Sequence, residues 1–424
     1  MNYLLVKMEK FFKPKNSGIL NKQQQEIADK ILNGKINCFI TGSGGCGKSF
    51  LLKYLIKKFS IKYKSDEIGV TAMTGIAAVS INGKTLHSFA GMGYKGENKP
   101  NFVAKRRWYK TKVLIIDEVS MLTKDFLDRL YPHMKYLQLI VCGDFHQLPP
   151  INGEFCFKSD VWDILNLRKN TFILTEIMRQ SDVNFIKALN DIRVGSITDE
   201  TVEYLKKLNI SKKKDTVTDN HTKLYTVNYN VDKENNKRLK QLETQLKVIK
   251  AQDTIKYKNK GSKNKNLLET CTKLIEKEAA TEIELKVGAQ IILTRNQVGG
   301  LLVNGSRGVV SDFINDLPKI KFQNGMEEVI KRVEYEIECK GIKIVRLQIP
   351  VKLSYSLTAH RAQSLSLPYL LVNFENSFEN GQCYTALSRA VTPENTVIDN
   401  VRSLLSFNKV SKDALDYYKS VEIK

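Results

Sequence analysis

The segment Gly42–Ser49, with the sequence GSGGCGKS, constrains what this chain can fold into more than any other feature. It follows a short apolar run, INCFI, and precedes FLLKYLIKKF, in which large apolar residues recur at helical spacing. A glycine-rich turn between a strand and a helix lets backbone N–H groups approach a phosphate, and the helix N-terminus adds a favourable potential. A chance glycine-rich turn is the alternative, but the flanking strand and helix argue against it. The sequence therefore predicts an α/β domain with a phosphate-binding loop.

The residues of this loop have separate expected roles in binding ATP and Mg²⁺. The glycines that would cradle the phosphates are Gly42, Gly44, Gly45 and Gly47. Lys48 is expected to reach the β- and γ-phosphates, and the Ser49 hydroxyl is expected to ligate Mg²⁺. ATP and Mg²⁺ are therefore the predicted cofactors.

A second apolar strand ends in two adjacent acids. In KVLIIDEVSML, the run Val113–Ile116 leads directly into Asp117 and Glu118. A carboxylate at such a strand end can hold the magnesium ion, and its neighbour can act as general base on the attacking water. An acidic turn without function is the alternative, and the phosphate-binding loop upstream favours the catalytic interpretation.

The segment VCGDFHQLPP, at 141–150, leaves a third apolar strand and continues into an unusual loop. In a parallel sheet, Gln147 would emerge at the carboxyl edge, where ligands bind, and could sense the γ-phosphate. Pro149 and Pro150 stiffen the loop, so a change at the nucleotide could move Phe145 or His146 against a second ligand. Loop residues without function are the alternative.

The net charge of +22 favours a polyanionic partner. A generally basic proteome would also explain it, because lysines outnumber arginines heavily. A hydrophobic fraction of 42% can supply a real core and argues against global disorder. The longest apolar runs are far shorter than a membrane span, so no membrane partner is expected.

The cysteines indicate the compartment. There are seven, with neither CxxC pairs nor zinc spacing, which fits buried thiols in a reducing environment. The N-terminal MNYLLVKMEKFFKPK lacks the features of a secretory signal. We expect a soluble, intracellular protein of the nucleus or cytoplasm, with the mitochondrion as a further option, that is not secreted.

Six motifs occur along the chain in a characteristic order. They are TAMTGIAAVSINGKTLHSFAGMG (71–93), GDFHQLPP, LTEIMRQ (174–180), VNGSRGVV (303–310), SLTAHRAQSLSL (356–367) and GQCYTALSRA (381–390). Together they resemble the Pif family of DNA helicases, superfamily 1 enzymes of the 5′→3′ group that are related to RecD. The resemblance runs from about Leu20 to about Asn400, which is nearly the whole chain.

The resemblance implies an α/β fold with two RecA-like parallel-sheet motor domains and a small Src-homology-3-like β-barrel inserted in the second. The expected parts are a flexible N-terminal arm at 1–19, a first motor domain at 20–181 with a short wedge-type insert at about 88–111, a second motor domain at 182–245 and 350–424, and an inserted basic loop and β-barrel at 246–349. Within the insert, the Lys- and Asn-rich VIKAQDTIKYKNKGSKNKN is expected to form a mobile basic loop.

The resemblance also implies further residues of the ATP site. In the helicase pattern L-x-x-x-Q, Gln24 would contact adenine, although Gln23 and Gln25 are each only one position away. Arg179 and Arg389 would be arginine fingers that reach the γ-phosphate across the cleft between the domains. For either arginine alone, a surface helix position is the alternative.

A set of residues would lie on the DNA path according to the resemblance. These candidates are Thr74, His87, Phe89, Phe145, His146, Asn304, Thr358, His360 and Gln363. Single strands are held by a basic groove and by aromatic faces that stack on bases. Packing in the core is the alternative for Phe89, and Trp108 is expected to pack at the domain edge.

The chain departs from the family pattern in two places. Ser364 stands where a glycine usually follows the glutamine of the T-x-H-[KR]-x-Q segment, which puts a turn near the DNA in doubt. The segment between HSFAGMG and the first acidic strand is short, so any strand-separating wedge there must be small.

The predicted function is an ATP-dependent helicase that moves 5′→3′ on single-stranded DNA and unwinds duplex or structured DNA, in replication, repair, recombination or telomere maintenance. The alternatives are a DNA-stimulated translocase without strand separation, a nonenzymatic DNA-binding scaffold and a phosphate-loop kinase. The expected partners are single-stranded and forked DNA, and the protein is expected to be a monomer. A sliding clamp could bind KMEKFFKP, although Leu5 replaces the usual glutamine and an incidental apolar arm is the alternative.

Overall fold

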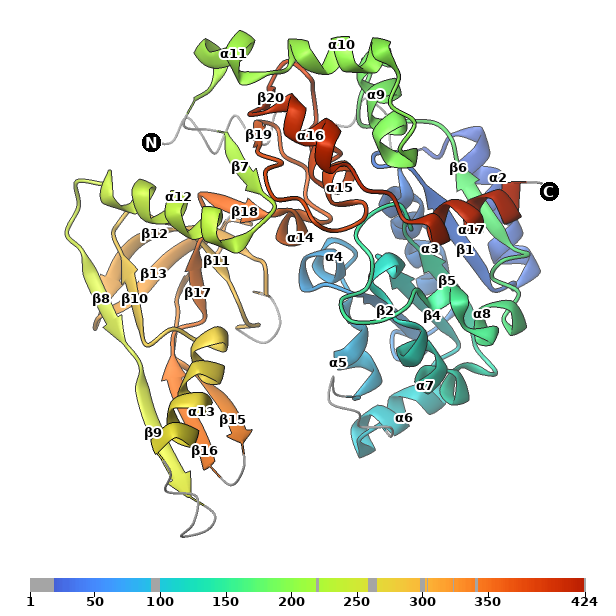
Figure 1. Ribbon diagram of the computed structural model, residues 1–424. Helices are drawn as coiled ribbons and strands as arrows, with labels where there is room; N and C mark the ends of the chain where they lie inside the picture. The colour runs from blue at the N-terminus through green and yellow to red at the C-terminus, as the bar shows by residue number, and fades with distance from the viewer. Residues whose placement is uncertain are drawn as a thin grey trace.

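The computed structural model describes residues 19–92, 100–218, 221–257, 265–297, 302, 304–322, 324–339 and 342–422. Most of the predicted N-terminal arm and part of the predicted wedge segment lie outside these ranges. The described chain builds two parallel sheets and, attached to the second, a region of antiparallel sheets (Figure 1).

The first sheet has six strands in the order β3-β2-β4-β5-β1-β6, and every pair in it is parallel. Its strands are β1 (Cys38–Gly42), β2 (Ile68–Ala72), β3 (Lys84–Thr85), β4 (Val113–Asp117), β5 (Gln138–Cys142) and β6 (Thr171–Leu174). The central strands β1, β4 and β5 are buried along their whole length, as expected where helices cover both faces of a parallel sheet.

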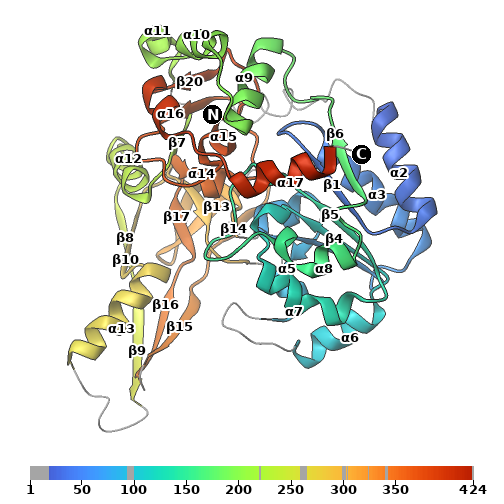
Figure 2. The same cartoon turned by 45° about the vertical axis from the view of Figure 1, so that its right-hand side comes forward.

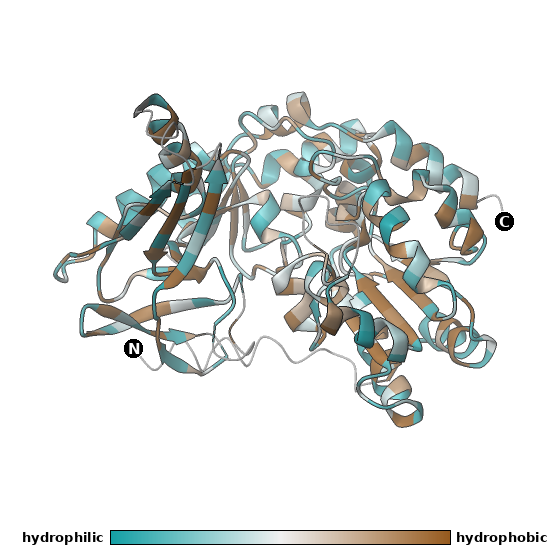
Figure 3. Cartoon of the chain, turned by 90° about the horizontal axis from the view of Figure 1, so that it is seen from below, coloured by the Kyte–Doolittle hydropathy of each residue, from teal (hydrophilic) through white to brown (hydrophobic). Residues whose placement is uncertain are grey.

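The helices of this domain connect its strands. They are α2 (Lys22–Gly34), α3 (Lys48–Lys62), α4 (Gly75–Ser80), α5 (Leu86–Ala90), α6 (Phe102–Lys110), η1 (Val119–Met121), α7 (Lys124–Met134), η2 (Cys156–Lys158) and α8 (Asp160–Ile164). Ile40 and Ile115 point to the face covered by α2 and α3, whereas Phe39 and Leu114 point to the face covered by α5 to α8. This alternation follows from the two-residue period of a strand. In Figure 3 the sheet strands are largely hydrophobic and lie inside a more hydrophilic layer of helices.

The C-terminal helix α17 (Lys412–Glu422) packs on the first domain. Ala414, Tyr417, Tyr418 and Val421 belong to the same hydrophobic core as Phe39. Figures 1 and 2 show this red helix lying against the first sheet. The predicted second motor domain, which ran to residue 424, therefore extends too far, because the last helix buries its aromatic face on the other domain.

The second sheet has four parallel strands in the order β18-β7-β19-β20. These are β7 (Thr222–Tyr225), β18 (Ser356–Thr358), β19 (Leu370–Val372) and β20 (Thr396–Ile398). Its helices are α9 (Val183–Val194), α10 (Asp199–Lys207), α11 (Ile210–Lys213), η3 (Lys214–Thr216), α12 (Asn228–Lys240), α14 (Ala359–Ala362), α15 (Gln382–Leu387) and α16 (Val401–Phe407). Because β7 lies between two strands from beyond the insert, the chain leaves this domain and returns to it.

The insert contains two antiparallel parts where a single small barrel was expected. One is a five-stranded sheet with a two-stranded ribbon, formed by β8 (Lys247–Lys250), β10 (Glu282–Leu285), β11 (Gln290–Leu293), β12 (Arg307–Ile314), β13 (Leu317–Phe322), β14 (Glu327–Val329) and β17 (Val351–Leu353). The other is a three-stranded sheet covered by a helix, formed by β9 (Gln252–Tyr257), β15 (Val333–Cys339), β16 (Ile342–Gln348) and α13 (Lys265–Glu278). The likeness to an Src-homology-3 barrel stays a prediction.

Much of the predicted basic loop is strand. Residues 248–250 lie in β8 and Gln252–Tyr257 form β9, which pairs with β16 along six residues. Arg346 of β16 is 1% exposed and binds both carboxylate oxygens of Asp253 at 2.7 and 2.8 Å. The lysine-rich composition of this segment predicted a loop. The sequence did not reveal the strand pairing, because the partner strand β16 lies about 90 positions further along the chain. Only the part of the predicted loop at 258–264 lies outside the described residues.

The cysteines and the helix lengths bear on the predicted environment of the protein. Six cysteines of the described chain are buried free thiols, namely Cys38, Cys46, Cys142, Cys156, Cys271 and Cys383. Across the described residues, every helix is too short or too polar to cross a bilayer.

Candidate active site

The phosphate-binding loop lies between the end of β1 and the start of α3. Gly45 and Gly47 adopt φ values of 89° and 84°, a left-handed conformation that disfavours any side chain. Space excludes a side chain as well, because a Cβ at Gly47 would lie 2.6 Å from Nε2 of Gln24 and one at Gly45 would lie 2.7 Å from Cβ of Arg179. The loop must therefore present bare backbone, which is what a phosphate cradle requires.

Lys48 opens α3 and turns back over the loop. Its Nζ donates to the carbonyl oxygens of Gly42 and Ser43 at 2.7 and 2.9 Å. Ser49 follows in the first turn of α3 and is exposed. The predicted phosphate-binding amine thus lies on the loop itself, with the predicted magnesium ligand beside it in the chain.

Gln24 is the residue of the QQQ run that reaches the loop. A capping box fixes it, in which the Gln24 N–H donates to Oδ1 of Asn21 and the Asn21 N–H donates to Oε1 of Gln24. Its Nε2 is buried and has no hydrogen-bond partner within the described chain. Because a buried donor without a partner is costly, this amide offers a hydrogen bond to a ligand, which fits the predicted adenine contact. Gln23 binds the end of β6, and Gln25 binds Asp29.

The two predicted acids stand at the end of β4. Asp117 is 5% exposed, and Glu118 follows it in a left-handed conformation with φ of 57°. Burial raises the pKa of Asp117 to about 7, and the negative charge of Glu118 adds to the shift. A divalent cation would favour the ionised carboxylate, and carboxylate and hydroxyl oxygens are ligands that Mg²⁺ accepts. Asp117 and Ser49 therefore fit a magnesium ion by their chemistry.

Of the two predicted arginine fingers, Arg179 contacts the loop, and Arg389 lies near enough to act on the charge of Arg179. The backbone N–H of Arg179 donates to the carbonyl of Gly45 at 3.1 Å, and its Nη1 donates to the carbonyl of Ser388 at 2.8 Å. Arg389, just after α15, donates from Nη2 to Oε1 of Gln147 at 3.3 Å. Burial lowers the pKa of Arg179 to about 10, and the charge of Arg389 adds to the shift. A half-buried and a buried guanidinium group that repel each other fit a site for a polyanion such as a triphosphate.

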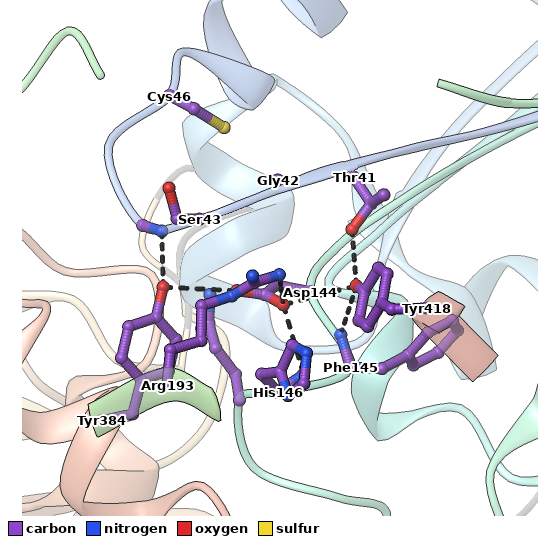
Figure 4. A network of polar contacts seen from close by, with 12 residues as sticks. Thr41, Gly42, Ser43, Cys46, Asp144, Phe145, His146, Arg193, Tyr384 and Tyr418 are labelled. Atoms are coloured by element: carbon purple, nitrogen blue, oxygen red, sulfur yellow. Dashed lines mark hydrogen bonds and ion pairs between the residues drawn. The ribbon is translucent and has the colours of Figure 1, made fainter. Parts of the chain in front are cut away.

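A buried carboxylate, Asp144, joins the two domains next to this site (Figure 4). Arg193 of α9 donates to its two oxygens at 2.8 and 3.1 Å, and the hydroxyls of Tyr384 and Tyr418 each lie 3.3 Å from it. Burial opposes ionisation of Asp144, but the Arg193 guanidinium outweighs it and holds the pKa of the carboxyl well below its usual range. Asp144 is therefore a charged anchor that the second domain holds.

This network also reaches the phosphate-binding strand and loop. The Tyr384 hydroxyl accepts a hydrogen bond of 2.7 Å from the N–H of Gly44, and the Tyr418 hydroxyl shares a hydrogen bond of 2.6 Å with Thr41 (Figure 4). The sequence reasoning missed Tyr384, Arg193, Tyr418 and the role of Asp144. The motifs GDFHQLPP and GQCYTALSRA contain Asp144 and Tyr384, and these polar residues inside quoted motifs were the available signal.

Two of the predicted DNA contacts are brought together from distant parts of the chain. Thr74 caps α4, and a Cβ at the next residue, Gly75, would lie 2.7 Å from the carbonyl oxygen of Asn304. Asn304 is exposed in a turn of the insert. The insert therefore touches the first domain at the start of α4.

His87 and Phe89, on α5, have different environments. His87 is half-buried and stacks on Phe126 with 4.3 Å between ring centroids, and burial lowers its pKa to about 4. Phe89 is 5% exposed and packs edge-on against Trp108 at 5.1 Å. The core interpretation of Phe89 and the packed position of Trp108 therefore agree with the structure, and the DNA-facing prediction for Phe89 does not.

Phe145 and His146 also differ from the prediction. Phe145 is fully buried among aromatic rings, with Phe39 at 4.9 Å and Trp162 at 5.7 Å between centroids. His146 is 4% exposed and stacks on Tyr418 at 4.7 Å. Neither ring has a free face for a base, because the C-terminal helix α17 packs over this loop.

The remaining candidates lie around α14 and bind within the protein. Thr358 caps α14, and Nε2 of His360 lies 2.6 Å from a carboxylate oxygen of Glu379. Gln363 is 1% exposed, and its amide donates to Glu118. In this arrangement the Gln363 side chain therefore faces the ATP site, and DNA would have to draw it away.

Known helicases are similar to this chain over most of its length. A family model described as "PIF1-like helicase" matches residues 19–203. The crystal structure of Pif1 helicase from Candida albicans matches with a TM-score of 0.79 and 31% identity, over 95% of this chain and 99% of that chain. This chain belongs to the PIF1-like helicase family.

Two further members extend the comparison. The ATP-dependent DNA helicase PIF1 of Danio rerio is 36% identical over 94% of this chain. The chain spans 64% of that relative's length. The crystal structure of Pif1 helicase from Bacteroides in complex with ADP-AlF3 and ssDNA matches with a TM-score of 0.74 and 26% identity, over 96% of this chain and 98% of that chain. The family resemblance and the fold with two RecA-like domains are thereby confirmed.

Proposed function

We propose that this protein is an ATP-dependent DNA helicase that translocates 5′→3′ on single-stranded DNA. One observation carries the proposal: the phosphate-binding loop of the first domain touches Arg179, Ser388 and Tyr384 at the interface with the second domain. A nucleotide bound there would contact both domains, so its binding and hydrolysis would change how the domains sit against each other. The Bacteroides relative crystallised with ADP-AlF3 and ssDNA supports the same pairing of ligands.

Each residue of the site would have its own role in phosphoryl transfer. Gln24 would bind adenine, the loop N–H groups and Lys48 would bind the phosphates, and Glu118 would accept a proton from the attacking water. Arg179 and Arg389 would stabilise negative charge that spreads over the γ-phosphoryl oxygens. Asp117 and Ser49 would hold Mg²⁺, which supplies additional charge stabilisation when it is bound.

Gln147 is suited to pass the state of the nucleotide to the second domain. Its Oε1 accepts a hydrogen bond from Arg389 at 3.3 Å, so the proposed sensor and the proposed finger are already in contact. A γ-phosphate that attracts Arg389 would compete with Gln147 for the same guanidinium. Alternating closure and opening of this interface would let the two domains grip a strand in turn.

The proposed partners are single-stranded and forked DNA. The net charge of +22 supports a polyanionic ligand. The exposed Asn304 and the half-buried Thr74 and His87 are the candidates whose positions best suit contact with a strand. Four properties stay predictions from the sequence: clamp binding through the N-terminal arm, a monomeric state, the compartment, and roles in genome maintenance.

A strand-displacement assay with 5′-tailed and 3′-tailed duplexes tests the proposal. We expect ATP-dependent release from the 5′-tailed substrate and none from the 3′-tailed one. DNA-stimulated ATP hydrolysis without strand release would favour the translocase alternative. Binding of DNA without any ATP hydrolysis would favour the nonenzymatic scaffold.

A further inference from the structure

The second domain occupies both carboxylate oxygens of Glu118, the proposed general base. The Ser364 hydroxyl donates to Oε1 at 2.5 Å, and the Gln363 amide donates to Oε2 at 3.1 Å. These donors are consecutive residues in the turn that follows α14. A single turn of the second domain therefore fixes the orientation of the carboxylate.

The backbone on both sides is in an uncommon conformation. Glu118 has φ of 57° and Ser364 has φ of 69°, and neither is a glycine. A non-glycine residue is uncommon in the left-handed region and persists where its surroundings hold it. The hydrogen bond between the two side chains is one such restraint. Ser364 is also the position at which a glycine would match the family pattern, and a glycine would bring no hydroxyl to Glu118.

Gln363 is bound incompletely in this arrangement. Gln363 is 1% exposed, and its Nε2 also lies 3.4 Å from the hydroxyl oxygen of Ser120. Its Oε1 is buried and has no hydrogen-bond partner within the described chain. Because a buried acceptor without a partner is unfavourable, another arrangement of this amide can replace the present one at little cost.

We propose that Ser364 and Gln363 restrain Glu118 when DNA is absent, and that a bound DNA strand releases it. The proposal rests on the function proposed above, because it assigns the regulation of the same ATP site. While both oxygens accept hydrogen bonds from the second domain, Glu118 must leave these donors before it can orient a water and take its proton. Ser364 is therefore a positioning residue that acts through Glu118.

The turn is placed to respond to DNA. It directly follows α14 (Ala359–Ala362), and His360, a candidate strand-binding residue whose side chain is partly exposed, lies in the first turn of this helix. The helix has only four residues, so a phosphate or base that moves its N-terminus also moves the turn at its end. Movement of the turn removes both donors from Glu118 together.

Ser364→Gly and Ser364→Ala test the proposal in the full chain. Both remove the hydroxyl, and Ser364→Ala keeps a side chain in the left-handed conformation, so their comparison separates hydrogen bonding from backbone strain. We expect kcat for ATP without DNA to rise about ten- to a hundredfold, as for loss of one hydrogen bond to a charged group. The KM for ATP and kcat with saturating single-stranded DNA should stay within about twofold of wild type, because Ser364 restrains Glu118 only when DNA is absent.

Two further variants make the result specific. Ser366→Ala removes a hydroxyl two residues further along the same turn region and should leave the DNA-free rate unchanged. Adding Glu118→Gln to Ser364→Gly should return the raised DNA-free rate to background, because the gain passes through Glu118.

The outcomes distinguish this proposal from the one on which it rests. If wild type is stimulated by DNA but both Ser364 variants keep the low DNA-free rate, the restraint on Glu118 is wrong and the helicase proposal stands. If wild type hydrolyses ATP at the same rate with and without DNA, both proposals are wrong.

Discussion

The hydroxyl oxygen of Tyr384 accepts a hydrogen bond of 2.7 Å from the backbone N–H of Gly44. Tyr384 belongs to α15 in the second domain, and Gly44 belongs to the phosphate-binding loop of the first. The same N–H is one of the donors that the loop would offer to a phosphate. Nucleotide binding must therefore replace a contact between the domains, which links occupancy of the site to the interface.

Tyr384→Phe should strengthen ATP binding in the absence of DNA. Loss of the hydroxyl leaves the Gly44 N–H without its partner in the empty site, so the nucleotide no longer has to displace one. We expect the Kd for ATP to fall about two- to tenfold, the effect of a typical hydrogen bond, by isothermal titration calorimetry.

Tyr417→Phe is the matched control for this prediction. The Tyr417 hydroxyl binds Trp162 and Thr171 in the first domain and should leave the Kd for ATP unchanged. Weaker ATP binding by Tyr384→Phe would contradict the prediction and would indicate that the hydroxyl contacts the nucleotide itself.

His146 should make the first domain less stable in mild acid. Burial lowers its pKa to about 4, with a further contribution from Arg193, whereas an unfolded histidine titrates near 6.5. Because the folded pKa is the lower one, the unfolded chain takes up the proton first. The stabilisation is therefore complete above pH 6.5 and is lost as the pH falls towards 4.

Urea unfolding at pH 7.5 and pH 5 measures this effect, with tryptophan fluorescence as the signal. Both tryptophans of the sequence, Trp108 and Trp162, lie in the core of the first domain. Between these pH values the wild type should lose about 2 kcal/mol more of its free energy of unfolding than His146→Gln does. Equal losses in both proteins would show that His146 does not titrate as its burial implies.

Phe145 should contribute to stability and not to DNA binding. Phe145→Ala should lower the free energy of unfolding of the first domain by about 3–5 kcal/mol, as for other buried phenylalanines. The milder Phe145→Leu keeps the core filled and should bind single-stranded DNA as wild type does in fluorescence anisotropy.

Asn304→Ala is the variant with which the DNA binding of Phe145→Leu is compared. Asn304 is exposed, so its replacement should weaken DNA binding with little effect on stability. A stable Phe145→Leu protein with greatly reduced DNA affinity would restore the original assignment of Phe145 to the DNA path.

The parts of the site that depend on local sequence were predictable. A strand, a glycine turn and a helix adjoin along the chain, so the loop from Gly42 to Ser49 and the strand end at Asp117 could be recognised without tertiary information. Arg179 and Arg389 could be assigned only from motifs that resemble a family, because no local pattern brings them to the loop.

The parts that depend on distant contacts were not predictable. Phe145 is a core residue because α17, which lies about 270 positions further along the chain, packs Tyr417 against it. The strand Gln252–Tyr257 was hidden by its lysine-rich surroundings, since its partner β16 lies beyond a helix and several strands. In both cases the deciding surface belongs to a segment that the local sequence does not reveal.

The central claim is that one ATP site at the interface of two motor domains is coupled to a DNA strand. Steady-state ATP hydrolysis with and without saturating single-stranded DNA tests it most directly, with Lys48→Ala as the background. We expect strong stimulation of the wild type by DNA, and no turnover by Lys48→Ala although that variant still binds DNA. Equal wild-type turnover in the presence and absence of DNA would contradict the claim.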